Sequence, residues 1–123
     1  MDFELSPAQK ELQARARALA ERHMAPRAAE IDRSEAYPWD HVERLRAAGM
    51  LGMTIPKELG GAGLGYLEAV LVIEEMAKHC GASARIVVET NMGAIGAILK
   101  YGSPAQRKLA ADLVPPSSIR PED

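Results

Sequence analysis

The sequence predicts an all-α protein of about six helices in an orthogonal or up-down bundle, and three observations support this fold class. Apolar residues recur at three- and four-residue spacing along most of the chain. Alanine is abundant, aromatic residues make up only 4% of the chain, and β-branched residues do not alternate with polar ones. The helix-start signature Ser-Pro-Ala-Gln occurs twice. With 123 residues, the chain has room for one compact domain.

The first helix is predicted to begin at Ser6, which can cap it. Pro7 then occupies the first helical position, and Gln9 completes a capping box. The apolar stripe that follows consists of Leu12, Ala16, Leu19 and Ala20. Pro26 should end or kink this helix, because proline cannot donate to the preceding turn. A second, short helix is expected from Pro26 to about Ser34.

A third helix is expected from Pro38 to Gly49, where glycine gives the usual C-terminal stop. Residues 50–65 then hold five of the ten glycines of the chain. This stretch is also rich in large apolar residues, namely Met50, Leu51, Met53, Ile55, Leu59 and Leu64. Flexible linkers are polar and poor in such residues. We therefore predict an ordered loop that crosses from one helical layer to the next.

The fourth helix is expected from about Tyr66 to Cys80, and it is apolar around most of its circumference, which predicts a central position. A fifth helix is expected from Ser83 to Tyr101. It contains Gly93 and Gly96, each of which costs about 1 kcal/mol relative to alanine inside a helix. Either a second helix packs very close to these glycines, or they line a space kept open for a ligand.

The second capping signature, at Ser103, predicts a sixth helix that runs to about Val114. The sequence thus divides into a helical domain at 1–114 and an irregular tail at 115–123. The tail is predicted because its three prolines cannot continue a helix and because it has few apolar residues to bury.

Composition bears on the class of function. The net charge of −2 gives no basic field that would attract nucleic acid or an acidic membrane. His23, His41 and His79 are scattered without ligand spacing, so we expect no metal site. Cys80 is the single cysteine and is expected in the core. The N-terminal residues do not resemble a signal peptide and no apolar run is long enough to span a bilayer, so the expected location is cytoplasmic.

The acidic pair in the fourth helix is expected to be structural, with Glu75 solvated and Glu74 paired by an arginine. Glu89 lies in an apolar stretch just before the glycine positions, which favours a buried carboxylate with a perturbed pKa. The glycine-rich run Gly61–Gly65 lacks the spacing of a dinucleotide or P-loop fingerprint. Taken alone, these residues do not build an active site.

In their order along the chain, four pieces resemble the N-terminal helical domain of the acyl-CoA dehydrogenase family. The pieces are Leu45–Gly52, Ile55–Gly65, Glu74–Ala77 and Tyr101–Lys108. The similarity covers residue 3 to about residue 114. The resemblance implies the all-α fold of that domain.

The resemblance also implies a chemistry. Members of the family use FAD to remove hydrogens from the α and β carbons of an acyl-CoA thioester. Their catalytic carboxylate and most of their flavin contacts lie in other domains of the enzyme. The resemblance therefore implies acyl-CoA and FAD as ligands of a complete enzyme, with no catalytic residue in this chain and no FAD held by this chain alone.

The N-terminal domain of the family forms one wall of the acyl cavity. By position, the implied substrate-binding residues are Glu89, Thr90, Gly93, Ala94 and Ala97. Among them, Gly93 and the two alanines would make a roomy pocket, which suits a long or bulky acyl group. Three interpretations remain open. The chain is part of a flavoenzyme completed by a further chain or by homo-oligomerisation, or it is a catalytically inactive helical module that self-associates through exposed apolar faces. The third is a free acyl-binding protein, which would need a pocket closed by helices alone.

Overall fold

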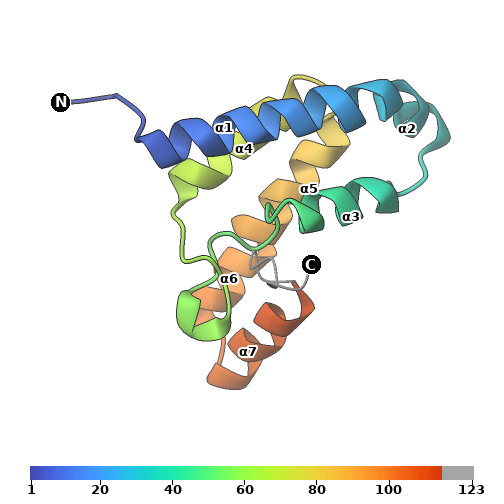
Figure 1. Ribbon diagram of the computed structural model, residues 1–123. Helices are drawn as coiled ribbons and strands as arrows, with labels where there is room; N and C mark the ends of the chain where they lie inside the picture. Colours follow the sequence, from blue (N-terminus) through green and yellow to red (C-terminus); the bar gives the residue numbers. More distant parts are fainter. Residues whose placement is uncertain (115–123) are drawn as a thin grey trace.

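The computed structural model describes residues 1–114, and these residues are helical with connecting turns (Figure 1). They form seven α-helices: α1 (Pro7–Leu19), α2 (Ala28–Ser34), α3 (Trp39–Ala47), α4 (Tyr66–Ala77), α5 (Gly81–Asn91), α6 (Ala94–Tyr101) and α7 (Pro104–Leu113). The three short turns of other helical types are a π-turn at Ala20–Met24 and 3₁₀ turns at Ala25–Arg27 and Lys57–Leu59. The predicted all-α class is confirmed. The predicted tail at 115–123 lies outside the described residues.

Both predicted capping boxes are present, and they set the starts of α1 and α7. The Ser6 hydroxyl accepts from the Gln9 backbone N–H at 3.1 Å, and the Gln9 side chain accepts from the Ser6 N–H at 2.9 Å. Ser103 and Gln106 repeat this exchange at 3.2 and 2.9 Å. Each box satisfies two backbone donors that a helix start otherwise leaves free.

The buried stripe of α1 continues into the π-turn with a constant spacing of four residues. Its members are Leu12, Ala16, Ala20 and Met24. An α-helix turns about 100° per residue, so each step of four overshoots a full turn by about 40°. In the π-turn, the Ala25 N–H bonds to the Ala20 carbonyl, so each residue turns less and the drift is reduced. The π-turn thus keeps Met24 on the face that packs against α4.

The α-helical winding of this segment ends before Pro26 is reached. The α-helix ends at Leu19, and Pro26 lies in the following 3₁₀ turn at Ala25–Arg27. Proline suits the start of such a turn because its missing N–H has no partner to lose there. The predicted short helix is α2, which begins at Ala28.

Residues 50–65 form an ordered loop, as predicted. Met50, Met53 and Ile55 are fully buried. The two arms of the loop are tied together where the Gly63 N–H donates to the Ile55 carbonyl and the Leu64 N–H donates to the Met53 carbonyl, both at 2.9 Å. Gly63 has φ 65°, a left-handed conformation that glycine adopts without steric cost.

The prediction of one continuous fifth helix is wrong. Residues 81–101 form two helices, with a break after Asn91. The buried Asn91 side chain donates to the carbonyls of Val87 at 2.9 Å and Met50 at 3.1 Å. Its side-chain oxygen accepts from the Thr54 N–H at 3.3 Å. These contacts fix the loop to the end of α5. Gly93 is the N-cap of α6 and therefore does not interrupt a helix.

Gly96 does lie inside a helix, and close packing explains it. A Cβ at this position would lie 3.2 Å from the Tyr66 hydroxyl, at the start of α4. The interpretation that a second helix approaches closely therefore holds for Gly96.

The core has two parts. The larger cluster joins α1, α3, α4 and α5, with α4 packed against both α1 and α5. The smaller cluster joins the loop to α6 and α7 through Ile55, Ile95, Ala110 and Ala111. The central position predicted for α4 holds for its inner face. Its outer face is more open than predicted, because Tyr66, Leu67 and Val70 are exposed.

Candidate functional site

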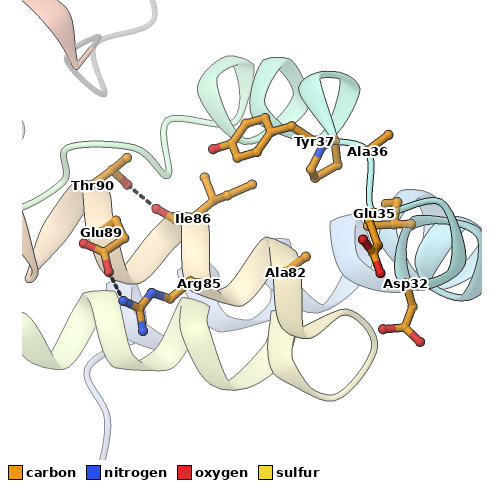
Figure 2. A pocket seen from close by; sticks show the side chains of 11 residues that line it. Asp32, Glu35, Ala36, Tyr37, Ala82, Arg85, Ile86, Glu89 and Thr90 are labelled. Carbon is orange, nitrogen blue, oxygen red and sulfur yellow. Dashed lines mark hydrogen bonds and ion pairs between the residues drawn. The ribbon is translucent and has the colours of Figure 1, made fainter.

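A cavity of about 520 Å³ lies between the end of α2, the segment that follows it, and one face of α5 (Figure 2). It is lined by Ile31, Asp32, Glu35, Ala36, Tyr37, Pro38, Ala82, Arg85, Ile86, Glu89 and Thr90. The end of α2 is set by Glu35, which has φ 57° and so turns the chain out of the helix. The cavity thus combines apolar walls with charged groups at its two ends.

One end of the cavity carries an ion pair. Arg85 Nη2 lies 2.5 Å from Glu89 Oε1, one helical turn further along α5. The Glu89 side chain is 41% exposed, so the prediction of a buried carboxylate is wrong. Burial fails because Glu89 points into the open cavity and its apolar neighbours on α5 point into the core. Thr90, beside it, donates its hydroxyl to the Ile86 carbonyl at 2.9 Å.

Sequence reasoning missed Arg85, Asp32, Glu35 and Tyr37 as cavity residues. The spacing of Arg85 and Glu89 is that of a helical ion pair, and this signal was available in the sequence. No comparable signal existed for Asp32, Glu35 and Tyr37. They reach the cavity only because α2 folds back beside α5.

The five residues predicted to bind substrate are not brought together in one pocket. Glu89 and Thr90 line the cavity, whereas Ala94 is exposed. Ala97 lies in a separate groove of about 450 Å³ between α6 and α7. Gly93 is beside Glu89, and Glu89 Oε2 fills the space that a Cβ on Gly93 would take. The room expected at Gly93 is therefore occupied by the carboxylate of Glu89.

The acidic pair of α4 has the opposite arrangement to the one predicted. Glu74 is exposed, and Glu75 is 1% exposed. Both Glu75 oxygens accept from the Arg17 guanidinium at 3.2 Å, and Lys78 donates to one of them at 2.9 Å. Hydrogen bonding from Arg17, against the cost of burial, holds the pKa of Glu75 below its usual range. The arginine partner was predicted for Glu74, but it pairs with Glu75, because Arg17 reaches α4 from α1.

A second buried polar group lies where α3 meets α5. His41 Nδ1 is 2.6 Å from the Ser83 hydroxyl, which is 3.4 Å from Cys80 Sγ. All three side chains are buried. Burial lowers the pKa of His41. Since no substrate can reach this group, it serves packing. Across residues 1–114, no cluster of three or more His, Cys, Asp or Glu side chains is placed to hold a metal ion.

The match to a family model decides the ancestry of this helical domain. The model described as "Acyl-CoA dehydrogenase, N-terminal domain" matches residues 6–111. The chain belongs to the acyl-CoA dehydrogenase family. No helix among the described residues is long and apolar enough to cross a membrane.

Curated relatives within the acyl-CoA dehydrogenase family carry several activities in their names. The chain is 62% identical over 112 residues to a 3-sulfinopropanoyl-CoA desulfinase of Variovorax paradoxus, with 91% of this chain and 28% of that protein covered. It is 41% identical to an acryloyl-CoA reductase (NADH) of Anaerotignum propionicum, covering 88% and 27%. It is 37% identical to human mitochondrial short-chain specific acyl-CoA dehydrogenase, covering 75% and 22%. The chain thus spans just over a quarter of the length of the desulfinases that it matches.

A solved structure has the same helical fold. It is described as the electron transferring flavoprotein of Acidaminococcus fermentans, and it matches with a TM-score of 0.80 at 27% identity. The match covers 89% of this chain and 29% of that one. The predicted resemblance to the N-terminal helical domain of the family is therefore confirmed in sequence and in fold.

The family is FAD-dependent in general, which raises the question of whether this domain can hold the flavin. Three carboxylates and one arginine line the cavity beside α5. The diphosphate of FAD carries two negative charges, and a single arginine among three carboxylates cannot neutralise both. The cavity residues therefore do not fit FAD, and no chemistry at the flavin is assigned to them.

Proposed function

We propose that this chain is the N-terminal domain of a 3-sulfinopropanoyl-CoA desulfinase. One observation carries the proposal. Four desulfinases are 55–62% identical to the chain, while the acryloyl-CoA reductase is 41% identical and the human short-chain dehydrogenase 37%. Since the chain spans 28% of the first of these proteins, the activity belongs to a complete enzyme that includes this domain.

In that enzyme the domain contributes one wall of the acyl pocket, near the junction of α5 and α6. The residues proposed to face substrate remain Glu89, Thr90, Gly93, Ala94 and Ala97. The cavity beside Glu89 and Thr90 supports this assignment. A short acyl group fits the proposal better than a long or bulky one, because Glu89 fills the space over Gly93.

Desulfination acts on an acyl group that ends in an anionic sulfinate. The bond between the β carbon and sulfur breaks, and the β carbon takes a proton. The sulfur group combines with the hydroxide of a water molecule and leaves as hydrogen sulfite, which gives propanoyl-CoA without an external oxidant. A sulfinate carries negative charge, and arginine pairs well with such planar or pyramidal oxyanions. Arg85 is the cation that lines the cavity among residues 1–114.

A domain exchange tests this function in a holoenzyme. Residues 1–114 replace the matching domain of the Variovorax paradoxus enzyme, and flavin absorbance and sulfite release from 3-sulfinopropanoyl-CoA are measured. We expect the chimera to retain flavin and to release sulfite. The matched control carries the domain of the human short-chain dehydrogenase, and it should lose most of this activity. A chimera that holds flavin but releases no more sulfite than the control would contradict the desulfinase assignment.

A second candidate function is that of a module that self-associates without catalysis. The exposed apolar side chains on the outer face of α4 favour it, since such patches mark contact surfaces. Light scattering together with a visible absorption spectrum of the purified chain separates the two. A colourless oligomer supports the module. A larger mass with a flavin band supports a dehydrogenase-type enzyme completed by a homo-oligomer or by another chain.

A further inference from the structure

We propose that Glu89 is an exchangeable counter-ion of Arg85, and that it sets the selectivity of the cavity between acyl groups with and without a terminal anion. This inference rests on the proposed function and assigns a role to a residue that is not itself complementary to an anionic substrate. In the unliganded domain the Glu89 carboxylate pairs with the guanidinium of Arg85. An acyl group that ends in an oxyanion displaces it.

The geometry of the pair permits such an exchange. Arg85 is 74% exposed and Glu89 41% exposed, and they meet at 2.5 Å on the cavity side of α5. In Figure 2, both side chains lie at one end of the cavity, while Asp32 and Glu35 lie at the other end. Within residues 1–114, no hydrogen bond or further ion pair joins Arg85 to another element. Its guanidinium can therefore change partner without disturbing the core.

The charge balance of the cavity makes the exchange necessary. Its lining carries three carboxylates, Asp32, Glu35 and Glu89, against the single cation Arg85. An incoming anion would meet repulsion from all three if the Arg85–Glu89 pair stayed closed. It gains a favourable contact only by taking Arg85 from Glu89. A neutral acyl group of the same length gains no electrostatic contact by separating Arg85 from Glu89. Glu89 therefore opposes anionic ligands specifically.

Gly93 helps to place the carboxylate of Glu89. The second carboxylate oxygen of Glu89 lies where a Cβ on Gly93 would be. Any larger residue at position 93 would push the carboxylate away from its present site. The glycine at position 93 is thus explained without a large acyl group. Because Gly93 has no side chain, it leaves room for the carboxylate of Glu89.

The test compares two four-carbon thioesters in the chimera described above. Butanoyl-CoA ends in a methyl group and succinyl-CoA in a carboxylate, and calorimetry gives the Kd of each without turnover. We expect Glu89→Gln to tighten succinyl-CoA by about two- to fivefold, the range of a half-exposed ion pair, and to leave butanoyl-CoA unchanged. Gly93→Ala should shift the selectivity in the same direction, and should add nothing in the Glu89→Gln background.

The matched control is Asp112→Asn, which breaks an ion pair of the same i,i+4 spacing on α7, where Lys108 and Asp112 meet at 2.7 Å. It should change neither Kd. The proposal is overturned if Glu89→Gln leaves both affinities unchanged or shifts both equally. Because binding is measured directly, this result is independent of sulfite release. A chimera that shows the selectivity shift but releases no sulfite would refute the desulfinase assignment and leave the counter-ion role standing.

Discussion

Glu75 is a carboxylate that sits inside the helical core and keeps its charge. Its two oxygens face Arg17 and Lys78, and both cations extend from the core toward solvent. A buried carboxylate is costly unless hydrogen bonds replace its hydration. Here three such bonds replace it, and the pKa falls because Arg17 favours the ionised form. The residue therefore links α1 to α4 through charge as well as packing.

Glu75→Gln should lower the free energy of unfolding at neutral pH by about 1–3 kcal/mol, the usual contribution of hydrogen bonds to a charged group. The stabilisation by Glu75 is fully present above the pKa of an unfolded glutamate, about 4.3. It is lost as pH falls through the lower pKa of the folded state. Urea denaturation at pH 7 and near pH 3 should therefore show a smaller gap between variant and wild type in acid. Glu74→Gln, one residue away and exposed, is the matched control and should stay within about 0.5 kcal/mol of wild type.

At the scale of elements, local signals in the sequence predicted most helix boundaries. Both capping boxes and the stop at Gly49 depend on residues within one turn of each other, so the sequence alone displays them. The break after Asn91 depends on the Met50 carbonyl, 41 residues away, and no local pattern indicates it. The same holds for Glu75, whose partner comes from α1, and for the cavity, which needs α2 beside α5. Errors arose where a contact between distant elements decided the outcome.

The loop at 50–65 is packed so tightly at Gly61 that one added methyl group should destabilise the protein. A Cβ on Gly61 would collide with the backbone of Ile55, which cannot move aside because Ile55 is buried. Gly61→Ala should therefore destabilise the protein by about 1–3 kcal/mol, as overpacking does.

Gly81→Ala is the comparison for that prediction. No atom lies within 4 Å of a Cβ at Gly81, which is the first residue of α5. This change should be neutral or stabilising by up to about 1 kcal/mol, since alanine loses less conformational freedom on folding. Thermal unfolding of both variants checks the pair. A Gly61→Ala variant as stable as Gly81→Ala would show that the backbone at Ile55 moves to make room for the added methyl group.

At the scale of the whole molecule, the division of the core predicts unequal local stability. The smaller cluster that holds α6 and α7 contains four buried apolar residues, against seventeen in the larger one. Local opening costs less where fewer apolar contacts are lost. Amide hydrogen exchange should therefore be faster in α7 than in α4 and α5. Equal protection across the three helices would contradict a core in two parts.

The π-turn at Ala20–Met24 has a consequence for how this domain can change in length. A π-turn contains one residue more than the α-helical turn it replaces. Elsewhere in α1, gaining or losing a residue rotates everything beyond it by about 100° and turns buried side chains outward. Within Ala20–Met24, a deletion can be absorbed by reverting to α-helical winding. Single-residue deletions among relatives of this domain should therefore collect at this turn and avoid the preceding stretch of α1.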